Sequence, residues 1–391
     1  MALDKDLHDN IVLNTFSLTP DSNTEYKFEI ACNAVTQFQL TSNAVKVGLE
    51  KLFHQYDSLE FSTKRALLET TYGVYSNAFN EPVQQVFSKE TQPLLFAMAA
   101  AYLFRNNPSI ANVDNIKIRM VEQFPGYDTI AVLAELEKYL DGHEKQVQEK
   151  TPDLKSLFEY SRSKGQKSIY SFQRWNRDYP GLAIVQNADG SFIRHPDGRL
   201  MIFEQLARSG SDLPYFITNG STPQGVYSIL GTGVSNNKLI GPTPNLQLLM
   251  PFEGKWENYF QLLQDQVWDT TKDVLDACEQ LLPPSWRKYG PMKETFYAGK
   301  IGRTEIIAHG STIDPEYFKD KPYYPLTPTL GCLCAKELWN VSNGYLLVSE
   351  QFNLVSAFTS TPGSKGYLYV INLDDQQKPV TREEVEYLLK K

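Results

Sequence analysis

The period of the hydrophobic pattern changes near residue 168, and this change divides the chain into two parts with different expected secondary structure. Over residues 1–150, apolar side chains recur at helical spacing, as in Phe28, Ala31 and Val35. No alternating strand pattern interrupts this first part. We therefore predict that it forms an all-helical domain.

Beyond a charged linker at residues 151–167, short apolar runs alternate with turn signals such as Asn-Ala-Asp-Gly at 187–190. The runs that predict strands lie at residues 169–172, 182–186, 191–195, 200–203, 214–218, 225–230, 304–308 and 366–372. Residues 256–282 instead have helical spacing and end at two prolines, which stop a helix. The sequence thus predicts an α+β protein, in which a mostly β domain at residues 168–391 carries a helical insertion.

Length and composition agree with this division and narrow the classes of partner. The chain has 391 residues, more than most single hydrophobic cores organise, so two domains are expected. Hydrophobic residues make up 41% and charged residues 21%, which is typical of globular proteins. The net charge is −8 and no block of Lys or Arg occurs, so we expect no nucleic-acid partner.

Export is the point on which the sequence leaves two interpretations open. No apolar run has the length of a membrane span, and residues 1–10 are charged where a signal peptide would be apolar. Either the protein is cytosolic, or an export signal has been removed from the chain.

The four cysteines are Cys32, Cys278, Cys332 and Cys334. They are too few and too scattered for a disulfide framework. The Cys-Leu-Cys stretch at 332–334 has no second group of ligands that would complete a zinc site. We therefore predict neither a metal site nor a cofactor.

Cys332 and His309 are the residues best suited to nucleophilic catalysis. A cysteine attacks as the thiolate, and a neighbouring imidazole can take up its proton. His309 follows a strand-like Ile-Ile-Ala run and precedes Gly310, which predicts a position at a strand end. Gly331 allows a tight turn before Cys332, and the N–H groups of these two residues are candidates for an oxyanion hole. Taken alone, a His before Gly and a Cys after Gly also occur without any catalytic role.

Three stretches together resemble the catalytic domain of the L,D-transpeptidases, also called the YkuD-type domain. The first is Thr-Pro-Gln-Gly-Val-Tyr at 222–227, the second is His-Gly at 309–310, and the third is Thr-Leu-Gly-Cys at 329–332. All three occur in the order that the family has. The resemblance covers about residues 168–372, so the helical part lies outside it.

The resemblance implies a β-sandwich-like fold and an extracytoplasmic enzyme, in the periplasm or cell envelope, that acts on peptidoglycan stem peptides. Members form a thioacyl-enzyme and pass the acyl group to an amine, as transpeptidases, or to water, as carboxypeptidases. Cys332 would be the nucleophile and His309 its base, while Gly310 and Ser311 would orient the imidazole. The helices of residues 1–150 would be free to bind an envelope partner.

The resemblance also implies a substrate groove, and the nucleophile loop departs from the family pattern at two positions. The expected groove residues are Tyr227, Arg303, Tyr324 and Thr329. The family loop is Ser-His-Gly-Cys, an apolar residue, then Arg or Asn, whereas here Leu330 replaces the His and Cys334 replaces the Arg or Asn. Arg303, Arg287 and Lys336 are candidates to replace the lost polar group.

Two other functions stay open on the sequence alone. The altered loop is compatible with a catalytically degenerate domain that acts as a cell-wall binding or scaffold protein. An unrelated cysteine hydrolase, in which His309 and Cys332 pair by convergence, would have the same residues and a different acyl donor.

Overall fold

The computed structural model describes residues 6–263 and 265–390, which form two compact units. The first unit comprises Met1–Gly142 together with Ser209–Gly220, and the second comprises His143–Arg208 together with Ser221–Lys391. A segment from the middle of the strand-rich part of the sequence therefore belongs to the helical unit.

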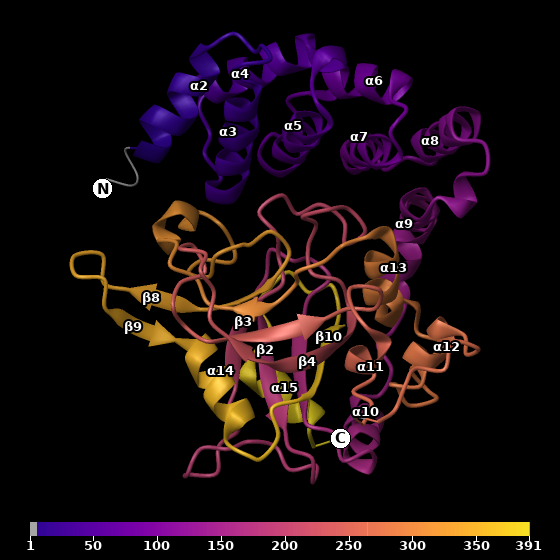
Figure 1. The fold of residues 1–391 in the computed structure, drawn as a ribbon, viewed down its shortest axis with the longest axis vertical. Coiled ribbons are helices and arrows are strands. Elements are labelled where there is room, and N and C mark those ends of the chain that lie inside the picture. Colours follow the sequence, from indigo (N-terminus) through magenta and orange to yellow (C-terminus); the bar gives the residue numbers. More distant parts are fainter. Residues whose placement is uncertain (1–5, 264, 391) are drawn as a thin grey trace. The chain divides into compact units, whose positions relative to one another are not determined.

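The first unit consists of helices (Figure 1). In chain order they are η1 (Asp6–Leu13), α2 (Asn14–Ser17), α3 (Glu25–Phe38), α4 (Asn43–His54), η2 (Tyr56–Ser58), α5 (Phe61–Val74), α6 (Asn80–Lys89), α7 (Pro93–Asn106), α8 (Ile110–Gln123), η3 (Tyr127–Thr129) and the first part of α9 (Ala131–Gln148). Every residue of α7 from 95 to 104 is buried, as its apolar sequence leads one to expect. No helix of the described chain is long and apolar enough to cross a membrane.

The segment Ser209–Gly220 packs into this helical unit and is not a strand. Leu213, Phe216 and Ile217 are fully buried, and Asn219 Nδ2 donates a hydrogen bond of 3.0 Å to Glu69 Oε2. The prediction of a strand at 214–218 is therefore wrong. Asp212 and Asn219 have positive φ angles, which bend the backbone at both ends of the apolar run.

The second unit is built around a closed eight-stranded barrel with the strand order β1-β10-β4-β5-β6-β7-β3-β2. These strands are β1 (Ser168–Gln173), β2 (Gly181–Gln186), β3 (Phe203–Leu206), β4 (Gly225–Gly233), β5 (Asn245–Leu249), β6 (Ala308–His309), β7 (Leu333–Ala335) and β10 (Gly366–Asn372). The pairs β1–β10 and β6–β7 are parallel, and the other neighbours in the barrel are antiparallel. Two further strands, β8 (Glu337–Trp339) and β9 (Leu346–Ser349), form a hairpin that extends away from the barrel (Figure 1).

The expectation of a β-sandwich-like domain is wrong, because the sheet closes on itself. β6 pairs with β5 on one side and with β7 on the other, and β7 in turn pairs with β3, so these strands leave no open edge. The closing strands contain two and three residues. Strands this short have no recognisable alternation, so their pairing could not be predicted from the sequence. The mixed composition of helices and strands was predicted correctly.

Helices surround the barrel within the second unit. They are α10 (Leu154–Ser163), α11 (Trp256–Tyr259), α12 (Val274–Glu279), η4 (Gly290–Lys293), α13 (Glu294–Ile301), η5 (Pro315–Phe318), α14 (Glu350–Thr359) and α15 (Arg382–Leu388). α10 occupies most of the segment that was expected to be a linker. Asp153 caps its first turn by accepting hydrogen bonds from Lys155 N and Ser156 N.

The expected helical insertion at 256–282 contains two short helices, α11 and α12, and not one continuous helix. Gln261 has a positive φ angle of 52°, which ends the first helical stretch. The rings of Phe260 and Trp268 then stack with centroids 4.5 Å apart and planes inclined by 14°. This aromatic contact joins two residues of the insertion that no continuous helix connects.

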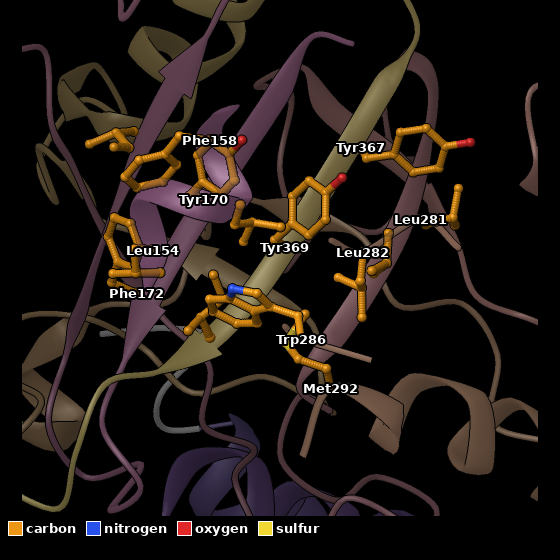
Figure 2. Close-up of a cluster of buried hydrophobic side chains, with 14 of the residues drawn as sticks. Leu154, Phe158, Tyr170, Phe172, Leu281, Leu282, Trp286, Met292, Tyr367 and Tyr369 are labelled. Carbon is orange, nitrogen blue, oxygen red and sulfur yellow. The ribbon is translucent and has the colours of Figure 1, made fainter. Parts of the chain in front are cut away.

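An aromatic core fills the space between α10 and the strands β1 and β10 (Figure 2). Phe158 of α10 lies edge-on to Tyr170 of β1 at 4.7 Å, and Tyr170 stacks on Tyr369 of β10 at 5.2 Å. Trp286 is fully buried in the same cluster, and its indole N–H donates to Asp153 O at 3.1 Å. Both faces of β1 and β10 are buried, so these strands anchor the barrel to its helical cover.

Arg174, the residue that follows β1, attaches the C-terminal helix to the barrel. Its side chain is fully buried, and its guanidinium donates to Asp374 Oδ1 at 2.7 Å and to Glu384 Oε2 at 2.7 Å. It also donates to the carbonyl oxygens of Lys378 and Pro379. Since Glu384 lies in the first turn of α15, these bonds tie α15 to β1.

We expect Arg174→Met to lower the free energy of unfolding by about 2–4 kcal/mol, because both carboxylates lose a buried partner. Lys378→Met is the matched control, since Lys378 is 54% exposed and lies 4.0 Å from Glu384; it should cost less than about 1 kcal/mol. Guanidinium denaturation followed by tryptophan fluorescence measures both changes. Equal losses in the two variants would contradict this role of Arg174.

Candidate active site

The loop that carries Cys332 is held in a sharp turn by the hydroxyl of Thr329. Thr329 Oγ1 accepts a hydrogen bond from Gly331 N at 3.0 Å and donates one to Cys332 O at 2.9 Å. Gly331 has a φ angle of 115°, which side-chain-bearing residues rarely adopt. Thr329, expected in the groove, is 6% exposed and supports the Cys332 loop, whereas Leu330 beside it is 49% exposed.

The Thr-Pro-Gln-Gly stretch, which leads into β4, is hydrogen-bonded directly to this loop. Thr222 Oγ1 donates to Gly331 O at 2.9 Å, and Thr222 N donates to Ala207 O at 3.0 Å. Tyr227, expected in the groove, is fully buried and donates its hydroxyl hydrogen to Pro223 O at 2.8 Å. Tyr227 therefore holds the Thr-Pro-Gln-Gly stretch in place and offers no surface to a substrate.

His309 lies in β6 and is held by the backbone that follows it. The ring is 4% exposed, and Nδ1 lies 2.5 Å from Gly310 O. A carbonyl oxygen can only accept, so Nδ1 carries the hydrogen and Nε2 is left with its lone pair. Burial lowers the pKa of His309 below its usual 6.5, and the contact with Gly310 O opposes this shift. The ring is therefore neutral at pH 7 and able to accept a proton.

The strand register places His309 at the C-terminal end of β6 and Cys332 just before the N-terminal end of the neighbouring parallel strand β7. His309 is opposite Cys334, and Ala308 is opposite Leu333. Cys332 is two residues before Cys334, which corresponds to an offset of about 7 Å along the strand. No hydrogen bond joins Cys332 Sγ to the His309 ring among the described residues. Direct proton transfer between them therefore requires the two side chains to approach to about 3 Å.

The sulfur of Cys332 contacts the backbone that precedes β6. Sγ accepts from Ile307 N at 3.4 Å and donates to Glu305 O at 3.4 Å. Burial raises the pKa of the Cys332 thiol to about 11, while the Ile307 N–H and the charge of Arg303 oppose this rise. At neutral pH the proton thus lies on sulfur, and a base is needed to remove it.

Arg303, expected in the groove, is buried near Cys332 and Tyr227. It is 5% exposed and donates through Nη1 to Ser221 O at 3.1 Å. Burial lowers the pKa of its guanidinium to about 10, and the negative forms of Tyr227 and Cys332 oppose that shift. Arg303 is thus a fixed positive charge that favours the thiolate of Cys332.

Of the two N–H groups that the sequence suggested for an oxyanion hole, those of Gly331 and Cys332, only one is available to a substrate. The Gly331 N–H is bonded to Thr329 Oγ1 and points into the loop. The Cys332 N–H has no acceptor within the described part of the chain, so it can receive the oxygen of a substrate carbonyl. The expected contribution of the Gly331 N–H is not compatible with this loop geometry.

Two predicted residues lie apart from this arrangement. The hydroxyl of Ser311 donates to Leu239 O at 3.4 Å and accepts from Ile313 N at 3.1 Å, so it does not orient the imidazole. Tyr324 is 41% exposed and donates to Glu316 Oε1 at 2.9 Å, and no hydrogen bond joins it to Cys332 among the described residues. All four cysteines are free, and Cys334 is buried with Sγ 3.5 Å from Thr327 Oγ1.

Comparison with protein-family models, curated proteins and solved structures found no match. The resemblance to the L,D-transpeptidases therefore rests on the three motifs themselves. In the structure, two contacts connect these motifs. One is the hydrogen bond from Thr222 to Gly331, and the other is the pairing of the parallel strands β6 and β7. A function has to be argued from these contacts.

We expect iodoacetamide to label Cys332 first, with a rate that rises about tenfold per pH unit above pH 7 and levels off near pH 11. The labelling rate rises with pH because the thiol pKa is raised, so the reactive thiolate accumulates only as the pH approaches that value. Cys334 should react far more slowly, since it is 1% exposed and burial raises its pKa to about 12. Peptide mapping by mass spectrometry assigns the label. A plateau already below pH 8 would contradict a protonated resting thiol.

Proposed function

We propose that the second unit catalyses cysteine-dependent acyl transfer on peptidoglycan stem peptides, as an L,D-transpeptidase or L,D-carboxypeptidase. The observation that carries the proposal is the parallel pairing of β6 with β7, which holds the His309 segment beside the Cys332 loop. The hydrogen bond from Thr222 to Gly331 O supports it, because it joins the remaining family motif to the same loop.

The proposed reaction begins with transfer of the thiol proton from Cys332 to Nε2 of His309. Sγ forms a bond to the carbonyl carbon of an L-centre, and the carbonyl oxygen becomes an oxyanion that the Cys332 N–H stabilises. The carbon–nitrogen bond then breaks, and His309 returns the proton to the departing amine. The products of this half-reaction are a thioester on Cys332 and a free amine.

The second half-reaction releases the acyl group. An amine or a water molecule gives a proton to His309 and attacks the thioester carbon, and the thiolate leaves and recovers that proton. An amine acceptor makes the enzyme a transpeptidase, and water makes it a carboxypeptidase. This substrate class also leads us to propose a location in the periplasm or cell envelope, with the helical unit as a candidate site for an envelope partner.

A second candidate function is that of a catalytically degenerate domain that binds or organises the cell wall. The observation that favours it is the resting state of Cys332, whose thiol has a pKa of about 11 and bonds to Glu305 O. Leu330 and Cys334 also replace polar residues of the family loop.

Intact-protein mass spectrometry with purified tetrapeptide stem fragments separates the two functions. We expect an adduct equal to the donor without its terminal residue, which Cys332→Ala abolishes and the matched control Cys334→Ala retains. Added amine should then convert the adduct into cross-linked product if the enzyme is a transpeptidase. A folded protein that forms neither adduct nor product would favour the degenerate domain.

A further inference from the structure

Glu337, the first residue of β8, is a buried carboxylate that the sequence did not single out. It is 3% exposed, and its Oε1 accepts a hydrogen bond of 2.5 Å from Ser349 Oγ, its partner in β9. Its other oxygen, Oε2, is buried and has no hydrogen-bonding partner among the residues described. A buried carboxylate with one unpaired oxygen costs stability, so packing alone does not account for it.

The carboxyl group of Glu337 lies directly against the backbone of Gly310. A methyl group added to the Gly310 Cα would lie 2.0 Å from the carboxyl carbon of Glu337 and 2.1 Å from Oε2. This distance is far below a van der Waals contact, so Gly310 is required for space. Ser349 restrains the carboxyl group from the other side and limits its ability to move away.

β8 holds the backbone after His309 at a second point as well. The indole N–H of Trp339 donates to Ser311 O at 2.8 Å. Burial raises the pKa of the Glu337 carboxyl group, and the hydroxyl groups of Ser349 and Thr243 and the Ser311 N–H oppose this rise. The turn formed by Gly310 and Ser311 therefore contacts two residues of β8, Glu337 and Trp339.

The same turn determines the orientation of the imidazole. Gly310 O lies 2.5 Å from Nδ1 of His309, and this contact decides which ring nitrogen carries the hydrogen. A shift of the Gly310 carbonyl would weaken that contact and allow the other tautomer, in which Nε2 carries the hydrogen and cannot accept a proton. The position of Glu337 is thereby linked to the basicity of Nε2.

We propose that Glu337 is a positioning residue, which holds the Gly310–Ser311 turn so that the Gly310 carbonyl fixes His309 with Nε2 unprotonated. Glu337 touches neither substrate nor the reacting sulfur in this role. Its importance for turnover rests on the proposed function, whereas its effect on the imidazole does not.

The first test measures the tautomer of His309 by ¹⁵N NMR in the full-length protein, without substrate. Wild type should show Nδ1 protonated and Nε2 unprotonated at pH 7.5. Glu337→Ala should give a mixture of tautomers, whereas Glu337→Gln, which keeps the shape and an oxygen acceptor for Ser349, should resemble wild type. Glu350→Ala, at the start of α14, is the control for loss of a neighbouring carboxylate. An unchanged tautomer in Glu337→Ala would overturn the proposal, as would an equal change in Glu350→Ala.

The second test uses the crowding at Gly310. Gly310→Ala should produce the same tautomer mixture, and Gly310→Ala combined with Glu337→Ala should be no worse than either single variant, because the two act on one turn. A larger tautomer change in the double variant, equal to the sum of the two single changes, would overturn the proposal. If Glu337→Ala does not fold, Glu337→Asp, which withdraws the carboxyl group by one methylene, replaces it.

Acylation kinetics then connect the turn to the proposed reaction. We expect the acylation rate constant of Glu337→Ala to fall at least tenfold with little change in KM, and Glu337→Gln to restore most of it. If wild type is not acylated by any donor while the tautomer responds as expected, the proposed function fails and the positioning role stands. If acylation needs Cys332 but is indifferent to Glu337, the positioning role fails alone.

Discussion

Two residues of β6, Ala308 and His309, pair in parallel with Leu333 and Cys334 of β7. This short ladder closes the barrel, because β5 and β3 pair with the other sides of the two strands. It also decides which segments can meet in the candidate site. The buried amide of Gln351 reinforces it by donating to Ala308 O at 2.9 Å. Without this pairing, the His309 segment and the Cys332 loop would have no reason to be neighbours.

Local patterns predicted the elements that are long enough to show a period. The helical spacing of the first part and the apolar run of α7 correspond to helices, and strands β1, β2, β4 and β10 cover predicted runs. The run predicted at 191–195 forms only isolated bridges. The pairing of strands far apart in the chain leaves no such periodic pattern in the sequence. The run predicted at 304–308 is a strand only at Ala308, and two residues give no sign of their pairing partners, so closure into a barrel was missed. The run at 214–218 resembles a strand because it is apolar, yet it is buried among helices of the other unit.

The candidate site was predictable where it is local and not where it depends on packing. Cys332, His309 and their neighbouring glycines stand next to recognisable turns in the sequence. Ser311 and Tyr324 were also predicted for the site, but their hydroxyl groups bond to Leu239 and Glu316 instead. Burial of Arg303 and Glu337 could not be predicted, since a single charged residue has no periodicity. Yet these two buried charges lie beside the two residues on which the proposed chemistry depends, one near the thiol and one against the His309 turn.

Proton transfer from Cys332 to His309 is the central claim, and the pH dependence of Cys332 acylation tests it most directly. The wild-type rate should rise through one ionisation below pH 6.5, where burial places the pKa of His309, and then stay level. In folded His309→Gln the rate should fall by about 10²–10⁴-fold and increase steadily with pH towards the ionisation of the thiol near pH 11. Identical rates and profiles in the two proteins would contradict a Cys332–His309 pair.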